Sequence, residues 1–591
     1  MATYKAPLKE MEFVLHEIAG MPELTALPGF AEATPELVMG VLEEAAKLVE
    51  GSIAPLNRSG DEEGCRFENG NVFTPAGFKQ AYELYTQAGW GGLALDPDYG
   101  GQGLPYLLST AVGEMLISAN TSFSMYPGLS EGCYEAIHTH GTDALKKLYL
   151  PRLVSGEWSG TMCLTEPHAG SDVGLGRTKA IPQPDGTYLI NGSKIFISAG
   201  DHDLTKNIIH LVLARLPDAP AGIRGITLFI VPKFLPNADG SVGARNKMSC
   251  GSIEHKMGIK ASSTCVLNFE NAAGYLIGEK NKGIQHMFTM MNAARLYVGL
   301  QGLGLAEHAT QNAVRYAKER RQGRPLTRKG ESSSEAVPII QHPDVRRMLL
   351  TMKAYTEGCR MLSYETAKRL DLARHHPDAG VREAATDYVD LMTPVCKAFF
   401  TDVGFEVSSL GVQVFGGNGY IRETGMEQNI RDAKIACIYE GTNGIQSLDL
   451  IGRKLPIGYG RLLRRFFEPV QAFIAAERNN ADLEFILVPL QKTFGKLQQV
   501  TVWMAERGMA DPNDAAAGAC EYLRLFGLVA LGYFWARAAQ VSITKTSDVF
   551  YRGKLATARF YAAHLLPQVN ALALSIMAGS EAVMQPGEDC F

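Results

Sequence analysis

The sequence contains a carboxylate, Glu440, in a setting that suits removal of a proton from carbon. It follows the apolar run KIACIY and lies in the glycine-containing turn EGTN. A carboxylate beside apolar residues is partly desolvated, which strengthens it as a base. A weakly acidic C–H group also needs donors that stabilise the oxygen on which negative charge develops. The segment 438–446 therefore predicts a general base in a turn.

Two further segments have the composition of ligand-binding loops. The segment MCLTEPHAGSDVG, at 162–174, is typical of a strand end followed by a loop whose amides and hydroxyls contact a polar ligand edge. The segment QVFGGNGY, at 413–420, contains three glycines close together, which permits a close approach of backbone to ligand. Glycines alone are weak evidence of a site, and Ser171 and Asp172 could simply cap a turn.

In this order, the segments 162–174, 413–434 and 438–446 resemble the acyl-CoA dehydrogenase family. The resemblance extends from about residue 82 to about residue 455. It implies an enzyme that binds FAD and oxidises an acyl-CoA thioester. In that family a glutamate removes the α-proton, and its backbone N–H and a flavin ribityl hydroxyl bind the thioester carbonyl. The β-hydrogen leaves as hydride to flavin N5. The resemblance assigns the base to Glu440.

A subset of the family carries its base on the helix that here reads MNAARLYVG. This sequence has Ala294 at that position, and alanine cannot accept a proton, so we keep Glu440 as the base. The next residue, Arg295, matches a family arginine close to the active site. We expect Arg295 to orient the Glu440 loop or the substrate, with a solvated surface cation as the alternative. Gly441 would leave room for the thioester.

The resemblance also implies FAD contacts spread along the chain. In KIFISAG, at 194–200, Phe196 and Ser198 stand where the family more often has Trp and Thr. The bidentate guanidinium of Arg320 suits the FAD pyrophosphate of a partner subunit, although a cation at a helix end is the plainer alternative. Ser171 would also lie near the CoA arm. The predicted cofactor residues are Leu164, Thr165, Ser171, Phe196, Ser198, Arg320, Gln322, Gln413, Gly416, Gly417, Thr442 and Asn443.

These segments lie in a chain whose pattern is first helical, then rich in strands, then helical again. Residues 1–159 carry apolar side chains at helical spacing, whereas 160–283 consist of short β-branched runs with an Asn-Gly hairpin signal. Helical periodicity returns over 284–457, and an Ala- and Leu-rich tract at 458–591 predicts an appended helical domain. The predicted fold is mostly α with a central antiparallel β-domain, in the order α-domain, β-domain, α-bundle and C-terminal helical domain.

Composition is that of a large globular protein. The chain has 591 residues, with 46% hydrophobic and 20% charged residues and a formal net charge of −5. That charge provides no general attraction for nucleic acid or anionic lipid. Ten cysteines are scattered singly, without ligand spacing, so we expect no metal. We found no secretory signal pattern and no apolar run near the ~20 residues that span a bilayer, and we expect a cytoplasmic protein without a membrane span.

Three other kinds of flavoprotein share parts of this pattern. A DNA-associated member of the superfamily would need a basic C-terminal domain, but residues 471–591 contain ten Lys or Arg and eleven Asp or Glu. A nitroalkane-oxidising enzyme would carry Asp at the position of Glu440. An acyl-CoA oxidase also uses Glu, so that alternative stays open. We expect an electron-transferring flavoprotein as the acceptor.

The N-terminal segment YKAPLKEMEFVL, the segment QHPDVRRMLL at 341–350 and the appended domain resemble one bacterial branch of the family. That branch includes enzymes for a thioether acyl-CoA and enzymes for ordinary fatty acyl-CoAs. We expect 3-(methylthio)propanoyl-CoA as substrate, with medium- or long-chain acyl-CoA as the alternative. An appended domain can cover the surface that a second dimer would use, so we expect a homodimer with a shared FAD site.

Overall fold

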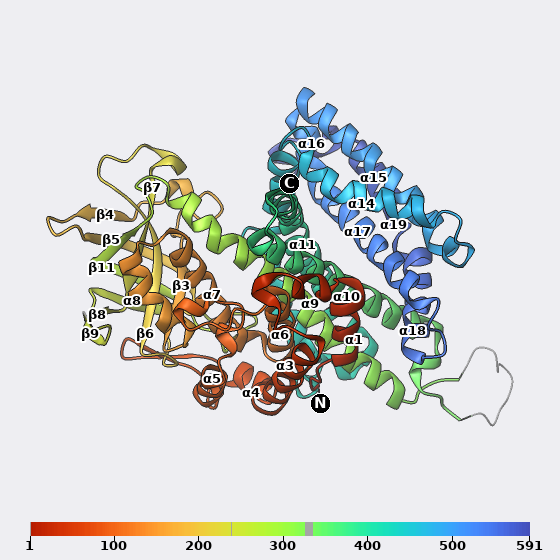
Figure 1. The fold of residues 1–591 in the computed structure, drawn as a ribbon, viewed down its shortest axis with the longest axis horizontal. Helices are drawn as coiled ribbons and strands as arrows, with labels where there is room; N and C mark the ends of the chain where they lie inside the picture. The colour runs from red at the N-terminus through yellow and green to blue at the C-terminus, as the bar shows by residue number, and fades with distance from the viewer. Residues whose placement is uncertain (1, 238, 325–334) are drawn as a thin grey trace. The chain divides into compact units, whose positions relative to one another are not determined.

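Two compact units make up the structure, a computed structural model that describes residues 2–237, 239–324 and 335–591. The sheet unit comprises Glu44–Tyr297, and the helical unit comprises Met1–Glu43 with Val298–Phe591. The division falls within two helices, α3 (Pro35–Leu48) and α9 (Gly283–Glu319) (Figure 1).

The sheet unit is built on a seven-stranded sheet in which five strands close a ring. The strand order is β10-β11-β5-β4-β6-β3, and β7 pairs with both β11 and β6, which closes the ring β11, β5, β4, β6, β7. Most pairs are antiparallel, as predicted, but β3 runs parallel to β6, and β4 meets β6 in a single parallel pairing. The strands are β3 (Trp158–Cys163), β4 (Lys179–Pro182), β5 (Tyr188–Ser198), β6 (Asn207–Arg215), β7 (Ile226–Pro232), β10 (Met248–Ile253) and β11 (Thr264–Ile277).

Successive side chains of the buried strands point to opposite faces of the sheet and contribute to two hydrophobic clusters. Strand β6 is buried almost throughout, because Leu211 points to a cluster shared with the helices and Val212 to a cluster among the strands. Helices α7 and α8 supply the first cluster, which contains the fully buried Trp158. The helices that lie wholly in this unit are α4 (Leu56–Glu63), α5 (Phe78–Gln87), α6 (Tyr106–Ala119), α7 (Thr121–His140) and α8 (Asp143–Val154).

A short hairpin interrupts the first helical segment, where helical spacing alone was expected. Strands β1 (Arg66–Glu68) and β2 (Asn71–Phe73) pair across Asn69 and Gly70, both of which have positive φ. An Asn-Gly pair supports this turn because both residues tolerate the left-handed conformation. Two further short strands, β8 (Phe234–Pro236) and β9 (Val242–Arg245), form a separate pair.

The helical unit is organised around the long helices α10 and α11 and the end of α9. A Cβ at Gly302 of α9 would lie 2.3 Å from the carbonyl oxygen of Phe400 in α11, so only glycine permits this approach of the two backbones. The helices that lie wholly in this unit are α1 (Leu8–Phe13), α2 (Met21–Thr25), α10 (Pro343–His375), α11 (Ala379–Phe415), α12 (Met426–Ala436), α13 (Asn443–Asp449), α14 (Arg461–Glu477), α15 (Glu484–Ala510), α16 (Pro512–Ala517), α17 (Ala519–Ser542), α18 (Val549–Phe560), α19 (Gln568–Met577) and α20 (Glu581–Met584).

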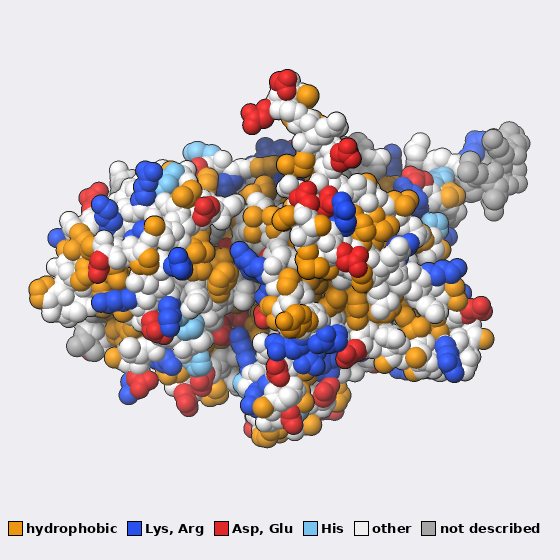
Figure 2. Space-filling model, turned by 90° about the horizontal axis from the view of Figure 1, so that it is seen from above, with side chains coloured by type: hydrophobic (Ala, Val, Ile, Leu, Met, Phe, Trp, Pro, Cys, Tyr) orange, Lys and Arg blue, Asp and Glu red, His pale blue; other side chains and the backbone are white. Residues whose placement is uncertain are grey.

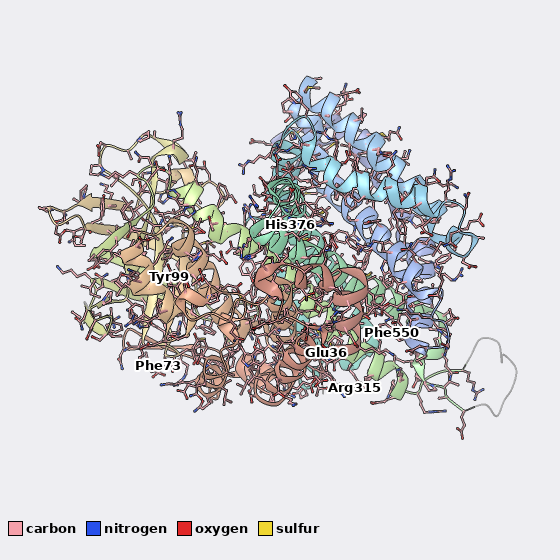
Figure 3. All side chains as sticks on the ribbon, in the orientation of Figure 1. Glu36, Phe73, Tyr99, Arg315, His376 and Phe550 are labelled. Atoms are coloured by element: carbon pink, nitrogen blue, oxygen red, sulfur yellow. The ribbon has the colours of Figure 1, made fainter. Side chains whose placement is uncertain are left out.

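Polar and aromatic contacts tie the C-terminal helices to the N-terminal segment. Phe550, labelled in Figure 3, lies on α18. It packs edge-on against Phe13 with ring centroids 5.5 Å apart. Lys554 is 1% exposed, and its ammonium donates to Glu10 and, at 2.9 Å, to Glu357. Burial alone would raise the pKa of Glu357, but Lys353 and Lys554 outweigh burial and hold that pKa at about 2. The resulting stabilisation is present above about pH 4.5 and is lost as the pH falls toward 2.

Replacement of Lys554 by methionine is expected to destabilise the helical unit. The variant would remove the ammonium that both Glu10 and Glu357 accept from, while the two carboxylates stay buried. Such a loss lowers the free energy of unfolding by about 3–5 kcal/mol. Lys545→Met is the matched control. Lys545 lies between α17 and α18 and pairs with Glu17 of the N-terminal segment in a partly exposed contact, and such pairs contribute about 0–1 kcal/mol. Denaturant unfolding of both variants measures the difference. Equal unfolding midpoints would show that the buried pair contributes no more than a surface pair.

Among the residues that the structure describes, one helical stretch, Val549–Met577, is long and apolar enough to cross a membrane by length and composition alone. The sequence prediction overlooked this stretch. In its most apolar window 39% of the residues are buried. Its helices pack on α15 and α17 within the helical unit.

Candidate active site

The predicted base lies in a strained turn between α12 and α13. Glu440 has φ +57° and Gly441 has φ +81°. A glutamate in this region costs of order 1–3 kcal/mol and persists only where its surroundings hold it. The amide of Gln446, which is fully buried, donates to the carbonyl oxygen of Glu440 at 3.0 Å, and the Thr442 hydroxyl caps α13 by accepting from the N–H of Ile445. The carboxylate is therefore presented from a fixed turn.

The same turn is held from α11 by residues that sequence reasoning missed. Lys397 donates to the carbonyl oxygen of Gly441 and to the side-chain oxygen of Asn443, both at 2.8 Å. Asn443 in turn donates to Thr401 and Asp402 at 2.9 and 2.7 Å. The one sequence signal was a lysine inside the apolar helical run TPVCKAFF, which alone predicts no partner.

In the sheet unit, two of the predicted flavin-binding segments lie side by side. The N–H of Ile195 donates to the carbonyl oxygen of Thr165 at 2.9 Å, which brings Leu164 and Thr165 next to Phe196. Phe196 is 60% exposed and has φ +58°. A fixed, exposed aromatic ring beside a polar loop fits the face and edge of a flat heterocycle such as the isoalloxazine of FAD.

A buried ion pair fixes this loop. Lys194, 1% exposed, donates to the carbonyl oxygen of Leu164 and to Glu166, both at 2.9 Å. Glu166 also accepts from the N–H groups of Arg177 and Thr178 at 2.7 and 3.0 Å. Burial alone would raise the pKa of Glu166, but Lys194 and these donors outweigh it and lower that pKa to about 2. Burial lowers the pKa of Lys194, and the charge of Glu166 opposes that shift. The Leu164 backbone is thus held by a buried ion pair.

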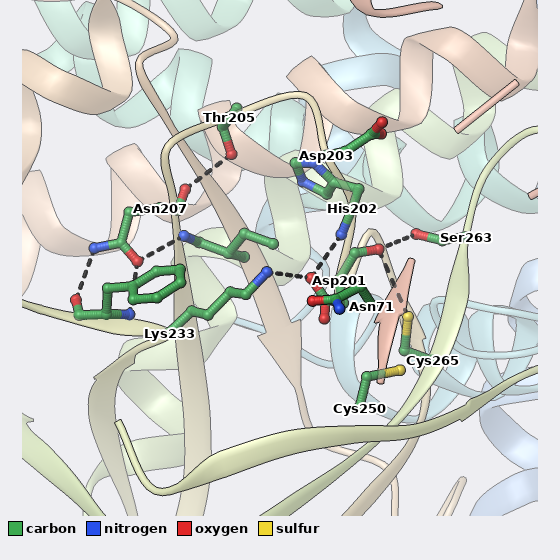
Figure 4. Close-up of polar contacts among 12 residues, drawn as sticks. Asn71, Asp201, His202, Asp203, Thr205, Asn207, Lys233, Cys250, Ser263 and Cys265 are labelled. Atoms are coloured by element: carbon green, nitrogen blue, oxygen red, sulfur yellow. Dashed lines mark hydrogen bonds and ion pairs between the residues drawn. The ribbon is translucent and has the colours of Figure 1, made fainter. Parts of the chain in front are cut away.

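A second polar network fixes the chain just after Phe196 and Ser198 (Figure 4). Asp201 accepts from the ammonium of Lys233 at 2.5 Å, and its carbonyl oxygen accepts from the hydroxyl of Ser263 at 2.8 Å. Burial lowers the pKa of His202 to about 3 and keeps that ring neutral. The end of β5 is therefore anchored where it carries two predicted flavin contacts.

The other predicted residues of the sheet unit are less closely grouped. Ser198 lies opposite Thr264 on β11. Ser171 is exposed in its loop, where Asp172 accepts from the N–H of Gly174 at 2.9 Å and so caps a turn. Arg295 is 6% exposed, with its guanidinium 5.9 Å from the ring centroid of Phe288. That burial argues against the solvated-cation alternative for Arg295.

The remaining predicted cofactor residues gather at one end of the helical unit. Tyr316 of α9 stacks on Phe415 of α11 with ring centroids 4.1 Å apart, and its hydroxyl accepts from Asn418 at 2.8 Å. These contacts join the end of α9 to the glycine loop after α11. The residues carried there are Arg320, Gln322, Gln413, Gly416 and Gly417, all of them exposed.

This exposed group is separate from the Glu440 turn. The turn is bound to α11 near Thr401, and Gln413 lies roughly 18 Å further along the helix axis at about 1.5 Å per residue. A Cβ at Gly416 or Gly417 would meet nothing within 4 Å, so the space beside both is open. The helical unit therefore presents two groups of predicted site residues.

The cysteines and metal-ligating side chains present no further centre in the part of the chain that the structure describes. All ten cysteines are free thiols. No group of three His, Cys, Asp or Glu side chains suited to a metal ion occurs among the described residues.

Four family profiles match the chain in succession. Three are described as acyl-CoA dehydrogenase domains: N-terminal at residues 39–157, middle at 161–272 and C-terminal at 281–455. The fourth, "Acetyl-CoA dehydrogenase C-terminal like", matches residues 466–586. The succession confirms the predicted fold class, including the appended helical part.

Relatives that align over nearly the whole chain are also acyl-CoA dehydrogenases by name. The chain is 44% identical to 3-methylmercaptopropionyl-CoA dehydrogenase of Ruegeria pomeroyi over 96% of this chain and 97% of that protein. It is 34% identical to the broad-specificity linear acyl-CoA dehydrogenase FadE5 of Mycobacterium tuberculosis over the whole of both chains. A crystal structure of an acyl-CoA dehydrogenase from Bacillus anthracis, complexed with FAD, matches with a TM-score of 0.76 at 22% identity, over 95% of this chain and 90% of that one.

Proposed function

Because the chain belongs to the acyl-CoA dehydrogenase family, whose members use FAD, we propose that it oxidises 3-(methylthio)propanoyl-CoA to the 2-enoyl thioester. Sequence identity supports this substrate. The chain is 44% identical to a relative named for that thioether and 34% identical to one named for linear acyl chains. The proposal places the enzyme in the breakdown of dimethylsulfoniopropionate. The second candidate is a general fatty acyl-CoA dehydrogenase.

In the proposed mechanism the Glu440 carboxylate takes the α-proton. The backbone N–H of Glu440 donates to the thioester oxygen, where charge develops, and Gly441 leaves room for the thioester. Bound FAD supplies the acceptor for the β-hydrogen. Thr165 and Phe196 are suited to hold the flavin ring, since they lie side by side in the sheet unit. Arg295 orients the substrate or the base loop.

A panel of thioesters tests the substrate. 3-(Methylthio)propanoyl-CoA and pentanoyl-CoA differ only by sulfur in place of a methylene, and we expect their kcat/KM values to lie within about tenfold of each other. We expect palmitoyl-CoA to be at least 100-fold poorer, because a pocket built for a short chain rejects a long one. Steady-state rates with an artificial electron acceptor measure this ranking. Comparable rates with palmitoyl-CoA would favour the general enzyme.

We propose an electron-transferring flavoprotein as the acceptor. An acyl-CoA oxidase remains the alternative, because it would also use a glutamate base. Anaerobic reduction by substrate followed by exposure to air separates the two. Slow reoxidation is the expected result, and rapid reoxidation would identify an oxidase.

The proposal includes a homodimer, a cytoplasmic location and the four-part division at residues 159, 283 and 457. It includes no nucleic-acid partner, because residues 471–591 contain ten Lys or Arg and eleven Asp or Glu. The face shown in Figure 2 has scattered acidic and basic side chains, with one cluster of basic side chains at its lower centre. The exposed group at Arg320 and Gln413 supports a dimer, since it lies apart from the Glu440 turn of its own chain and is open to solvent.

A further inference from the structure

Lys397 has no role in the proposed chemistry, yet it is fully buried beside the catalytic turn. It lies in the middle of α11, is 0% exposed and donates to the carbonyl oxygen of Gly441 at 2.8 Å. A buried ammonium is costly to desolvate and is retained where strong acceptors surround it. The acceptors here are a backbone carbonyl and the side-chain oxygen of Asn443, both in the turn that carries Glu440.

The contact falls in a strained part of the backbone. Glu440 and Gly441 are two successive residues with positive φ, and only the second is a glycine. Gln446 donates to the carbonyl oxygen of Glu440 at 3.0 Å and, at 3.4 Å, to that of Gly441. The Gly441 carbonyl therefore depends on Lys397 for its short, charge-assisted hydrogen bond, and such bonds are about twice as strong as neutral ones.

Lys397 is itself on a rigid support. A Cβ at Gly299 of α9 would lie 2.8 Å from the carbonyl oxygen of Cys396, the residue before Lys397. The hydroxyl of Thr401 donates to the carbonyl oxygen of Lys397 at 2.8 Å and accepts from Asn443 at 2.9 Å. Because α9 and α11 pack closely at this point, the Lys397 ammonium is held in place and in turn restrains the turn at Gly441.

We infer that Lys397 is a positioning residue for the catalytic base: its buried ammonium holds the Gly441 carbonyl and Asn443, and so fixes the left-handed turn that aims the Glu440 carboxylate. The inference rests on the proposed function, because it assigns Lys397 an effect on proton removal by Glu440. A shift of about 1 Å in a reacting group can cost about 100-fold in rate. Removing the ammonium should therefore affect proton transfer more than binding.

Exchange of the α-hydrogens tests proton removal separately from hydride transfer. (Methylthio)acetyl-CoA carries sulfur at its β position and has no β-hydrogen to transfer. Holoenzyme in deuterated water should incorporate deuterium at the α carbon, as followed by mass spectrometry. Lys397→Met keeps the side-chain volume but removes the donors, and we expect it to slow exchange by about 10- to 100-fold. We expect FAD content to be kept and the Kd for this thioester to change by less than about threefold.

Lys368→Met is the matched control. Lys368 is a buried lysine of α10 that pairs with Glu23, so its loss reports the general effect of removing a buried ammonium. Exchange in Lys397→Met within about twofold of the parent overturns the inference, and so does a loss equal to that of Lys368→Met or proportional to lost FAD. If Lys397→Met does not fold, Lys397→Gln, whose shorter side chain removes the ammonium charge from the Gly441 carbonyl, is measured against the same criteria.

The parent enzyme and Glu440→Gln distinguish this inference from the proposed function. If the parent exchanges and Glu440→Gln does not, the base is established and the Lys397 variants decide the inference alone. If Glu440→Gln exchanges the α-hydrogens as fast as the parent, Glu440 is not the base, and the inference about Lys397 is also wrong.

Discussion

Replacement of Glu440 by glutamine is expected to lower kcat by about 10³- to 10⁴-fold while FAD and acyl-CoA still bind. Glutamine has nearly the same size and can keep the turn, but its amide is not a base. The change therefore removes proton abstraction and leaves the contacts of the turn with Lys397 and Gln446, which involve the backbone and Asn443. Single-turnover reduction of FAD by substrate measures the loss directly.

Glu406→Gln is the control for the loss of a carboxylate. Glu406 lies on α11 and pairs with Arg524 at 3.0 Å in a partly exposed contact, and we expect normal turnover from its variant. Glu440→Asp adds a geometric test, because it keeps the carboxylate but withdraws it by one methylene. Near-normal turnover of Glu440→Gln would remove this residue from the mechanism.

The sequence predicted those parts of the site that depend on local residue types. An acid followed by a glycine after an apolar run predicted the turn at Glu440, and the structure adds that Glu440 itself has positive φ. The loop after β3 was likewise predicted as a strand end followed by a turn, because glycine and small polar residues favour that conformation. Periodicity predicted helices and strands in the observed order.

Features that depend on contacts between distant segments were not predictable from one sequence. The parallel pairing of β3 with β6 forms across two intervening strands, and no local pattern specifies it. Lys397 and Gly441 are far apart in the chain, and their hydrogen bond exists because α12 and α13, which flank the Glu440 turn, both pack on α11. The Val549–Met577 stretch was overlooked because charged residues in its first half mask the apolar second half.

The roles of Arg320 and Gln413 stay predictions, because a shared site can only be tested with two chains. Both residues are exposed, and they lie apart from the Glu440 turn of the same chain. In a two-fold dimer each FAD would take its base from one subunit and its pyrophosphate contacts from the other. Arg320→Met is therefore expected to weaken FAD binding by about 10- to 100-fold, as for a charge-assisted hydrogen bond of about 1.5–3 kcal/mol.

Arg321→Met is the control for Arg320→Met. The guanidinium of Arg321 donates to the carbonyl oxygen of Ala336 in its own chain at 2.9 Å, so we expect its variant to keep FAD. FAD released on ultrafiltration measures retention at several protein concentrations. If FAD is shared, retention should rise with concentration together with the dimer fraction seen by light scattering.

Mixed dimers of Glu440→Gln and Arg320→Met give the sharpest test of a shared site. Co-expression of Glu440→Gln with Arg320→Met places both defects in one site of each hybrid dimer and leaves the other site intact, if Arg320 acts across the interface. Random pairing makes half of the dimers hybrid. At a free FAD concentration at which Arg320→Met alone has lost its FAD, we therefore expect about a quarter of the parent's activity. If Arg320 serves the FAD of its own subunit, every site keeps one defect and mixing restores nothing. A monomer that retains FAD would also refute the shared site, whereas a tetramer would refute only the idea that the C-terminal helices cover the second interface.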